Sequence, residues 1–496
     1  MPGFPMTRPR GRGLALAVSA LMLVGSAPVV AATAAADTSS GAAPAPAAPA
    51  HRHLYVGGFA SPAIAGAAVT RNGAMRPVSG TPFPSGPNSL GMAITPDGRT
   101  LYSVSAGLQL SSLAVVPGTI TAYRIGDDGV LRETAETTAP GPVIGAAVTP
   151  DGKRLFVTVS TGSTGQVLSY DIASSGALTP TGAAPAAVPS GISQVVISPD
   201  ARHLYVSNFL TNSMSSFAIA PDAGLTSIGE PLATGAQPAI PSISPDGRYL
   251  YVGNEGSGDL SCYVIGKDGA LTPAPGSPYA SGATPHGPIF SPDSRRLYVA
   301  NASGNTISGW QVGDDGRLSP LPGSPFASPD VARVVLSPDA KVLYAMTGAP
   351  RKSGKVSSFA VRPDGGLTPT GYPALDTGLF WHDGSNAFLT PNQGPAAALR
   401  ADGDSRALTR TFTAAGSSDP DGRVVRYRWD FGDGTVRTTT TPRVTHRYAT
   451  AGARTVSVTV TDDEGCSTEL VYNGTTVECR GGAQARATEQ VVVGRP

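Results

Sequence analysis

The residues best suited to acid–base chemistry in this sequence are Glu255 and His286, which directly follow Asn254 and Pro285. A carboxylate and an imidazole within hydrogen-bonding reach can activate water, as a hydrolysis requires. That reaction also needs donors for the developing oxyanion. We therefore take Glu255 and His286 as candidate catalytic residues, with the amides of Asn254 and Asn301 as donors.

Three asparagines and a second histidine extend this candidate site. We predict that four residues bind a ligand: Asn208, Asn254, Asn301 and His382. The alternative is structural, with the asparagines capping turns between strands and His286 lying in solvent. Convergence of Glu255, His286 and His382 around one pocket would favour a catalytic role over the structural one.

A repeated motif determines where these residues lie. A Ser/Thr-Pro-Asp turn followed by a Leu-Tyr-Val-like strand recurs with its aspartates 46 to 54 residues apart, at Asp97, Asp151, Asp200, Asp246, Asp293 and Asp339. A second marker, Gly-x-Leu or a close variant, keeps the same period. Two markers in step at this spacing indicate a propeller or a solenoid.

Each repeat contains four short strand signals separated by turns. Around Asp200 these are residues 193–197, 204–207, 214–219 and a strand that begins near Leu225. Proline presets φ and glycine accepts positive φ at the turns, whereas tyrosine and valine favour the strands between them. Four-stranded units of about 40–50 residues predict the blades of a β-propeller.

The ends of the repeat region predict how the ring closes. Residues 53–56 have the pattern of a second strand without a first, and residues 386–390 that of a first strand without a second. Paired together they complete a seventh blade and remove exposed sheet edges. We predict an all-β protein with a seven-bladed propeller over 51–392, in which Leu54 pairs with the 386–390 strand.

Propeller ligands are expected at a channel mouth, beside the start of each innermost strand. The aligned positions there are Leu90, Ile144, Ser193, Ala239, His286, Ala332 and Ser385. His286 is the titratable residue among them, and no arginine occupies any of the seven. The mouth therefore lacks an arginine clamp for a phosphate group.

The N-terminus has the pattern of an export signal. Three arginines precede an apolar run at 14–24, and small residues suited to cleavage follow. We expect a signal peptide at 1–36, an Ala/Pro-rich linker at 37–50, and a secreted protein without a membrane span after cleavage.

Charge and composition exclude several partners. Lys+Arg number 36 and Asp+Glu 35, for a net charge of +1 without a basic cluster, which argues against nucleic acid. The sequence has no phosphate loop, nucleophile elbow or nucleotide fingerprint, and His51 with His53 alone cannot form a zinc site. We expect no cofactor, no bound metal and a monomer.

The period stops near Pro395, and strands of a different spacing follow. Residues 425–429, 456–460 and 491–493 form alternating or apolar runs, which predict a small β-sandwich over 393–496. Cys466 and Cys479 flank a short loop with an Asn-Gly turn signal, and we predict a disulfide across that hairpin. The third cysteine, Cys262, is expected to be a small buried side chain.

Four motifs in this second region carry a family resemblance. They are Ser-Asp-Pro-Asp-Gly at 418–422, Trp-Asp-Phe-Gly-Asp-Gly at 429–434, His-Arg-Tyr-Ala at 446–449 and Val-Thr-Val-Thr-Asp at 458–462. Together they resemble a PKD domain, which implies an immunoglobulin-like sandwich that acts as a spacer or binds a ligand or polysaccharide. The cysteine hairpin is an insertion relative to the shortest members.

The aspartates of these motifs have two interpretations. Asp419, Asp421, Asp430 and Asp433 could form a calcium cluster, but their spacing matches no calcium loop with a defined ligand set. We favour the structural interpretation, in which their side chains shape Asp-Gly turns. Trp429 is likewise expected in the sandwich core.

The blade motif also carries a resemblance. Ser/Thr-Pro-Asp-Gly-Arg-x-Leu-Tyr-Val-x-Asn, with a closing Asp-Gly-x-Leu-Thr-Pro, resembles the lactonase-type seven-bladed propellers and the YVTN repeats. The resemblance implies one of three kinds of protein. It could be a sugar-lactone hydrolase, of which 6-phosphogluconolactonase is the best-known activity, or a muconate-lactonising enzyme. The third kind is a non-catalytic surface-layer or cell-wall protein.

Lactonase-type members share a Pro-Arg-His or Pro-His and an Asn-Glu at the mouth. This sequence keeps Pro285-His286 and Asn254-Glu255, but has Pro238-Ala239-Ile240 where an Arg-His pair is expected. Our first hypothesis is therefore an exported binding or surface-interaction protein whose partner is an extracellular polysaccharide, the cell wall or a protein. The alternative is a secreted lactone hydrolase that uses Glu255 and His286.

Overall fold

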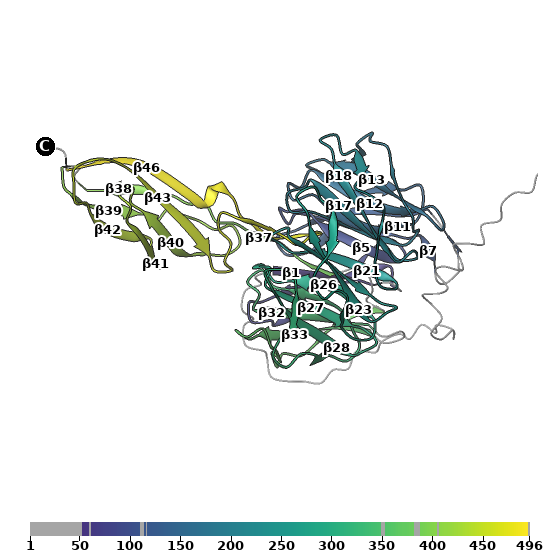
Figure 1. Ribbon diagram of the computed structural model, residues 1–496. Coiled ribbons are helices and arrows are strands. Elements are labelled where there is room, and N and C mark those ends of the chain that lie inside the picture. Colours follow the sequence, from purple (N-terminus) through teal and green to yellow (C-terminus); the bar gives the residue numbers. More distant parts are fainter. Residues whose placement is uncertain are drawn as a thin grey trace, which may run out of the picture.

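The computed structural model describes most of the chain (Figure 1), namely residues 52–58, 61–109, 114–115, 117–348, 353–380, 387–403 and 406–494. These residues form strands and turns, and the helical segment among them is a single 3₁₀ turn, Ala483–Ala485. No helix of the described ranges is long and apolar enough to cross a membrane. The expected signal peptide and linker lie outside the described residues.

Seven antiparallel sheets of four or five strands form a propeller in the described part of the chain. In one blade the strands β16 (Ser193–Ile197), β17 (His203–Asn208), β18 (Ser213–Ile219) and β19 (Leu225–Ser227) pair in chain order. Short turns allow only this meander, since antiparallel neighbours can be joined by a few residues. The four strand signals predicted for each repeat are confirmed.

The innermost strands of neighbouring blades lie side by side and line a central channel. They are β5 (Ser89–Ile94), β11 (Val143–Val148), β16, β21 (Pro238–Ile243), β26 (Pro285–Phe290), β31 (Val331–Leu336) and β36 (Ala387–Leu389). All seven run in the same direction along the channel. We call the end where they begin the mouth and the end where they finish the base.

The ring closes as the two chain ends predict. β1 (Arg52–Gly57) pairs with β36 in the register Leu54↔Leu389, Tyr55↔Phe388 and Val56↔Ala387. The last blade therefore combines the first and the last strands of the propeller, and the seven-bladed prediction is confirmed.

Neighbouring blades are joined by a recurring hydrogen bond. The tyrosine of the Leu-Tyr-Val strand donates its hydroxyl to the carbonyl of a turn glycine in the next blade, over 2.5 to 3.0 Å: Tyr55 to Gly129, Tyr102 to Gly176, Tyr205 to Gly269, Tyr251 to Gly316 and Tyr298 to Gly365. These tyrosines are completely buried. The bond explains why the two sequence markers keep the same period.

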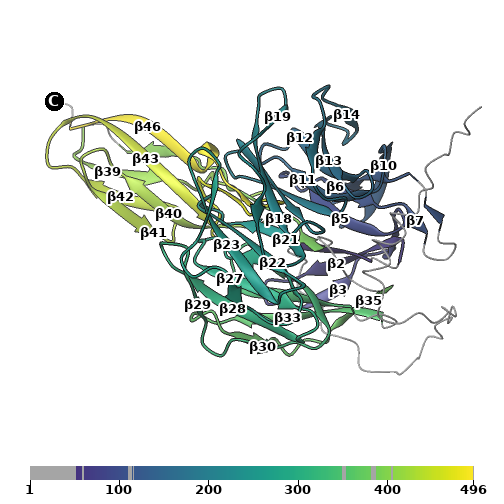
Figure 2. The same ribbon diagram turned by 45° about the vertical axis from the view of Figure 1, so that its right-hand side comes forward.

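The second domain is a sandwich of two antiparallel sheets beside the propeller (Figures 1 and 2). One sheet contains β38 (Arg400–Asp402), β39 (Thr409–Thr413) and β42 (Arg443–Arg447), and the other β40 (Val424–Asp430), β41 (Val436–Thr439), β43 (Gly452–Asp462) and β46 (Arg486–Val493). Trp429, Phe431 and Phe412 are fully buried between them. The expected sandwich and the core position of Trp429 are confirmed.

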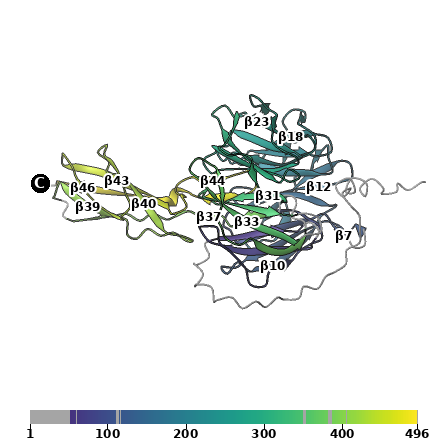
Figure 3. The same cartoon turned by 90° about the horizontal axis from the view of Figure 1, so that it is seen from below.

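The cysteine hairpin leaves the sandwich and enters the base of the channel (Figure 3). Its strands are β44 (Leu470–Tyr472) and β45 (Val477–Arg480), and the predicted Cys466–Cys479 disulfide is present. The carbonyl of Asn473 accepts from the amide of Ile243 at 3.1 Å, and that of Gly474 from Ile197 at 2.9 Å. The turn therefore continues the hydrogen bonding of two innermost strands.

Side chains fasten this insertion. The Tyr472 hydroxyl donates to the carbonyl of Val148 at 2.8 Å, and Tyr472 and Val477 join the apolar core of the propeller. The segment β37 (Asn392–Gln393), which connects the domains, adds a parallel strand to β45. The hairpin is therefore part of the propeller interior, and the PKD-like domain is not a freely jointed spacer.

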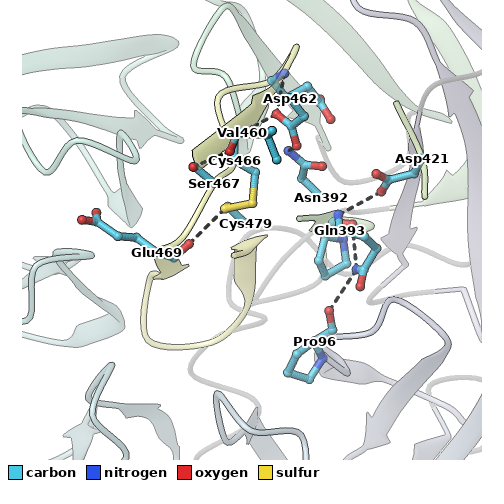
Figure 4. The surroundings of a disulfide bond; sticks show 12 residues. Pro96, Asn392, Gln393, Asp421, Val460, Asp462, Cys466, Ser467, Glu469 and Cys479 are labelled. Carbon is cyan, nitrogen blue, oxygen red and sulfur yellow. Dashed lines mark hydrogen bonds between the residues drawn. A yellow bond between two sulfur atoms is a disulfide. The ribbon is translucent and has the colours of Figure 1, made fainter. Parts of the chain in front are cut away.

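Charged and polar side chains hold the domains together around the same junction, where Asn392 and Gln393 lie beside Asp462 and Asp421 near the disulfide (Figure 4). Arg52, which is 4% exposed, pairs with Asp421 and Glu464 of the sandwich. Nearby, the Asn392 amide donates to Asp462 at 3.0 Å and the backbone amide of Gln393 donates to Asp421 at 3.0 Å. The interface thus depends on buried ion pairs as well as on apolar contact.

We predict that Arg52→Met lowers the free energy of unfolding by about 3–5 kcal/mol, because it leaves buried carboxylates without their cation. The matched control is Arg132→Met, since Arg132 pairs with Asp128 at the surface with a 61% exposed side chain. That change should cost less than about 1 kcal/mol. Denaturant unfolding of both variants checks the prediction, and equal losses would contradict it.

Candidate functional site

The structure brings Glu255 and His286 together at the channel mouth. Glu255 directly follows β22 (Tyr249–Asn254), and His286 lies at the start of β26 in the next blade. The Nε2 atom of His286 is 3.3 Å from Oε1 of Glu255, and its Nδ1 atom is 2.8 Å from the carbonyl oxygen of Ala332. Three neighbouring blades therefore fix the position of this imidazole.

The two residues differ in exposure. His286 is 4% exposed, whereas the Glu255 side chain is 19% exposed. Both imidazole nitrogens of His286 face oxygen atoms, the carboxylate of Glu255 and the carbonyl of Ala332. His286 is therefore a buried residue held between two acceptors and not a solvated one, and Glu255 is the member that reaches water.

The three candidate asparagines are fully buried within their own blades. Each donates its amide to side-chain oxygens five and seven residues further on: Asn208 to Ser213 and Ser215, Asn254 to Asp259 and Ser261, and Asn301 to Thr306 and Ser308. These bonds fit the alternative in which the asparagines stabilise turns between strands. Ligand binding by them stays a prediction, and His382 lies outside the described residues.

Sequence reasoning missed Arg333, which lies on β31 next to the mouth position Ala332. The register of β31 shifts between Val331 and Arg333, so a bulge displaces the side chains from the simple alignment. Arg333 is 6% exposed and reaches towards Gly287, where a Cβ atom would lie 1.4 Å from its Nη1. An arginine inside an apolar strand was the signal that could have identified it.

A cavity of about 30 Å³ lies in the channel between Arg333 and the inserted hairpin. Its walls come from β31, β36 and the hairpin, whose residue Glu478 also lines it. Burial raises the pKa of Glu478 to about 8, although the Asn473 amide donates to this carboxyl group at 3.0 Å and opposes the shift. Burial lowers the pKa of Arg333 to about 10, so its guanidinium stays charged at neutral pH.

Acidic residues gather at the domain junction, in a group that includes only Asp419 of the four aspartates considered for calcium. Carboxylate oxygens of Asp419, Asp462 and Asp463 lie within 4.8 Å of one another and could hold a metal ion. Burial, followed by the charge of Asp462, raises the pKa of Asp419 to about 7. Asp433 lies in another turn, where it pairs with His446 at 2.7 Å.

Arginines already engage this acidic group. Arg71 of the propeller and Arg423 of the sandwich both pair with Asp463. The arrangement fits domain attachment, and the expected absence of a metal stays a prediction.

Two family models match the chain. A model described as "Lactonase, 7-bladed beta-propeller" matches residues 179–284, and one described as "PKD domain" matches residues 392–477. A microbial collagenase of Vibrio alginolyticus is 38% identical over 85 residues, which are 17% of this chain and 10% of that protein. The pre-pro-metalloprotease PrtV of Vibrio cholerae is 51% identical over 51 residues, 10% of this chain and 5% of that protein. The chain thus spans about a tenth or less of these relatives.

Solved structures resemble the propeller. The periplasmic gluconolactonase of Pseudomonas aeruginosa is 20% identical with a TM-score of 0.54, over 68% of this chain and 98% of that one. A candidate 6-phosphogluconolactonase of Bacteroides uniformis is 18% identical with a TM-score of 0.56, over 68% and 99% of the two chains. At these identities the likeness shows the fold alone.

We predict that Gly287→Ala destabilises the protein more than the same substitution at another glycine whose φ is also positive. Gly287 has a φ of 55°, and an added Cβ would collide with Arg333. The matched control is Gly371→Ala, where φ is 82° and no atom lies within 4 Å of the added Cβ. We expect losses of about 2–5 kcal/mol for Gly287→Ala and about 1–2 kcal/mol for the control in denaturant unfolding. Equal losses would show that Arg333 does not occupy this space.

We also predict that Glu478 makes the protein less stable as the pH rises. Its folded pKa of about 8 exceeds the ordinary glutamate value of 4.5, so the folded state holds the proton more tightly than the unfolded state. The stability that this carboxyl group contributes is complete below about pH 4.5 and is lost as the pH rises through about 8. Glu478→Gln should flatten the dependence of melting temperature on pH in this range, whereas Glu469→Gln, an exposed glutamate of the same hairpin, should not. A slope unchanged by Glu478→Gln would refute the assignment.

The architecture, the repeat and the two family models agree. Seven blades closed by β1 and β36 surround a channel whose mouth carries the Glu255–His286 pair. The sandwich matches the second family model and extends the chain beyond the propeller. The chain is a seven-bladed β-propeller that matches the lactonase model over residues 179–284, followed by a C-terminal domain that matches the PKD model over residues 392–477.

Proposed function

We propose that the protein is an exported hydrolase that opens a lactone at the mouth of the propeller channel. The observation that carries the proposal is the contact between His286 and Glu255, 3.3 Å apart on adjacent blades. A buried imidazole beside a carboxylate that reaches water is the arrangement expected of an acid–base pair.

The chemistry follows from the two exposures. Glu255 takes a proton from a water molecule whose oxygen attacks the ester carbonyl. The Nε2–H of His286 holds the Glu255 carboxyl group in place. Collapse of the tetrahedral intermediate breaks the bond between the carbonyl carbon and the ring oxygen. The proton held by the pair then passes to that oxygen, which yields a hydroxy acid.

The mouth favours a lactone without a phosphate group. None of its seven aligned positions carries an arginine, and the buried Arg333 lines the cavity beneath. Phosphate recognition usually depends on guanidinium or ammonium donors. We therefore expect a sugar lactone or a related neutral cyclic ester as substrate.

A second candidate function is extracellular binding, and the PKD domain favours it. Its match to proteins named as collagenases, together with the disulfide, supports a protein that works outside the cell. In this hypothesis the sandwich binds a polysaccharide, the cell wall or a protein. The end of the sandwich that carries the C-terminus points away from the propeller and is open to such a partner (Figure 1).

We predict that the chain, expressed with its leader and purified, hydrolyses members of a panel of aldonolactones and aryl lactones. Glu255→Gln and His286→Asn should each lower kcat/KM by at least about 100-fold, because each removes a member of the acid–base pair. The matched control is Glu230→Gln, which changes an exposed glutamate of a surface loop and should keep full activity.

Two results would contradict the hydrolase. One is turnover that survives in both Glu255→Gln and His286→Asn, and the other is no turnover above buffer with any lactone of the panel. The second result, combined with retention of the chain on a polysaccharide or cell-wall matrix, would favour the binding hypothesis.

A further inference from the structure

Arg333 is a buried cation without a counter-ion among the described residues. Its Nε and Nη1 atoms have no hydrogen-bond partner, and no carboxylate of the described ranges pairs with it. An uncompensated charge in a protein interior costs several kcal/mol, so such groups are almost always paired. The structure therefore calls for a negative charge beside this guanidinium.

Glu478 does not supply that charge. It lines the same cavity, but its Oε1 accepts from the Asn473 amide and its Oε2 has no partner. Because burial favours the protonated carboxyl group, Glu478 is neutral around pH 7 and can itself act as a donor. The cavity then has unsatisfied donors on both sides.

The remaining walls are mostly apolar. They include Ile289, Val335 and Leu336 of the propeller together with Phe388 and Val477. The volume of about 30 Å³ admits one or two particles of the size of a water molecule. A carboxylate ligand or a phosphate has too many heavy atoms to fit, whereas a halide ion is only slightly larger than water.

We propose that this channel cavity is a binding site for one small monovalent anion of halide size, held against the Arg333 guanidinium. Both domains build the site, since β31 supplies the cation and the inserted hairpin supplies Glu478 and the cover at the base. Gly287 leaves the space that Arg333 occupies. The bound anion neutralises the channel interior, and it stabilises the docked hairpin because the cavity exists only when the hairpin is in place.

The experiment uses bromide as the probe. Crystals of the full chain are soaked in sodium bromide, and anomalous scattering at the bromine edge locates the ion. We expect a peak within hydrogen-bonding distance of Nε or Nη1 of Arg333. Ordered water at this position, or a cavity without an anomalous peak, would overturn the proposal.

Thermal melting tests the same site in solution. Chloride is titrated against gluconate at constant ionic strength, since gluconate is too large for the cavity. The intact chain should show a saturable rise in melting temperature, because an ion that binds only the folded state stabilises it. Arg333→Met should lose the rise, and the Arg132→Met surface control should keep it.

The two measurements separate the site from general salt effects. A chloride response that is identical in Arg333→Met and in the intact chain would contradict the proposal. Should Arg333→Met fail to fold, the bromide position in the intact chain decides the question alone. Neither measurement depends on lactone hydrolysis, so failure of the anion site and failure of the proposed function are distinguishable.

Discussion

The propeller depends on one hydrogen bond that recurs at five of its seven blade junctions, from a second-strand tyrosine to a turn glycine of the next blade. It joins the two sequence markers of the repeat, because the Leu-Tyr-Val strand carries the donor and the Asp-Gly turn supplies the acceptor. Where Phe156 replaces the tyrosine, the facing turn carries the buried Ala223 in place of the glycine. The bond fixes the spacing between blades, and with it the positions of the seven innermost strands.

These positions determine what the channel can do at each end. At the mouth, neighbouring blades place a buried imidazole between a carboxylate and a carbonyl oxygen, 3.3 Å and 2.8 Å away. At the base, backbone amides at the ends of β16 and β21 donate hydrogen bonds to carbonyl oxygens of the hairpin turn. The PKD domain is therefore attached through the propeller interior, and its hairpin occupies the base of the channel.

Charge is concentrated where the two domains meet. Arg52 and Arg71 of the propeller engage sandwich carboxylates, and Arg333 and Glu478 line one cavity without forming an ion pair. Buried charges specify a docked geometry more strictly than apolar contact does, because every misplaced partner leaves an expensive unpaired group. The interface consequently attaches the sandwich to the propeller and also places polar side chains in the interior of the channel.

The sequence alone determined the seven blades, their closure by β1 and β36, the sandwich and the disulfide, because turn residues, strand alternation and a fixed period are local signals. It also proposed Glu255 and His286 as an acid–base pair, but left open whether their side chains converge. The tertiary structure decided that contact, the place of Arg333 and the insertion of the hairpin. Arg333 depends on a bulge that no residue type marks, and Tyr472 meets Val148 across 324 positions of the chain. Such contacts follow from the packing of whole blades and domains, which local patterns do not encode.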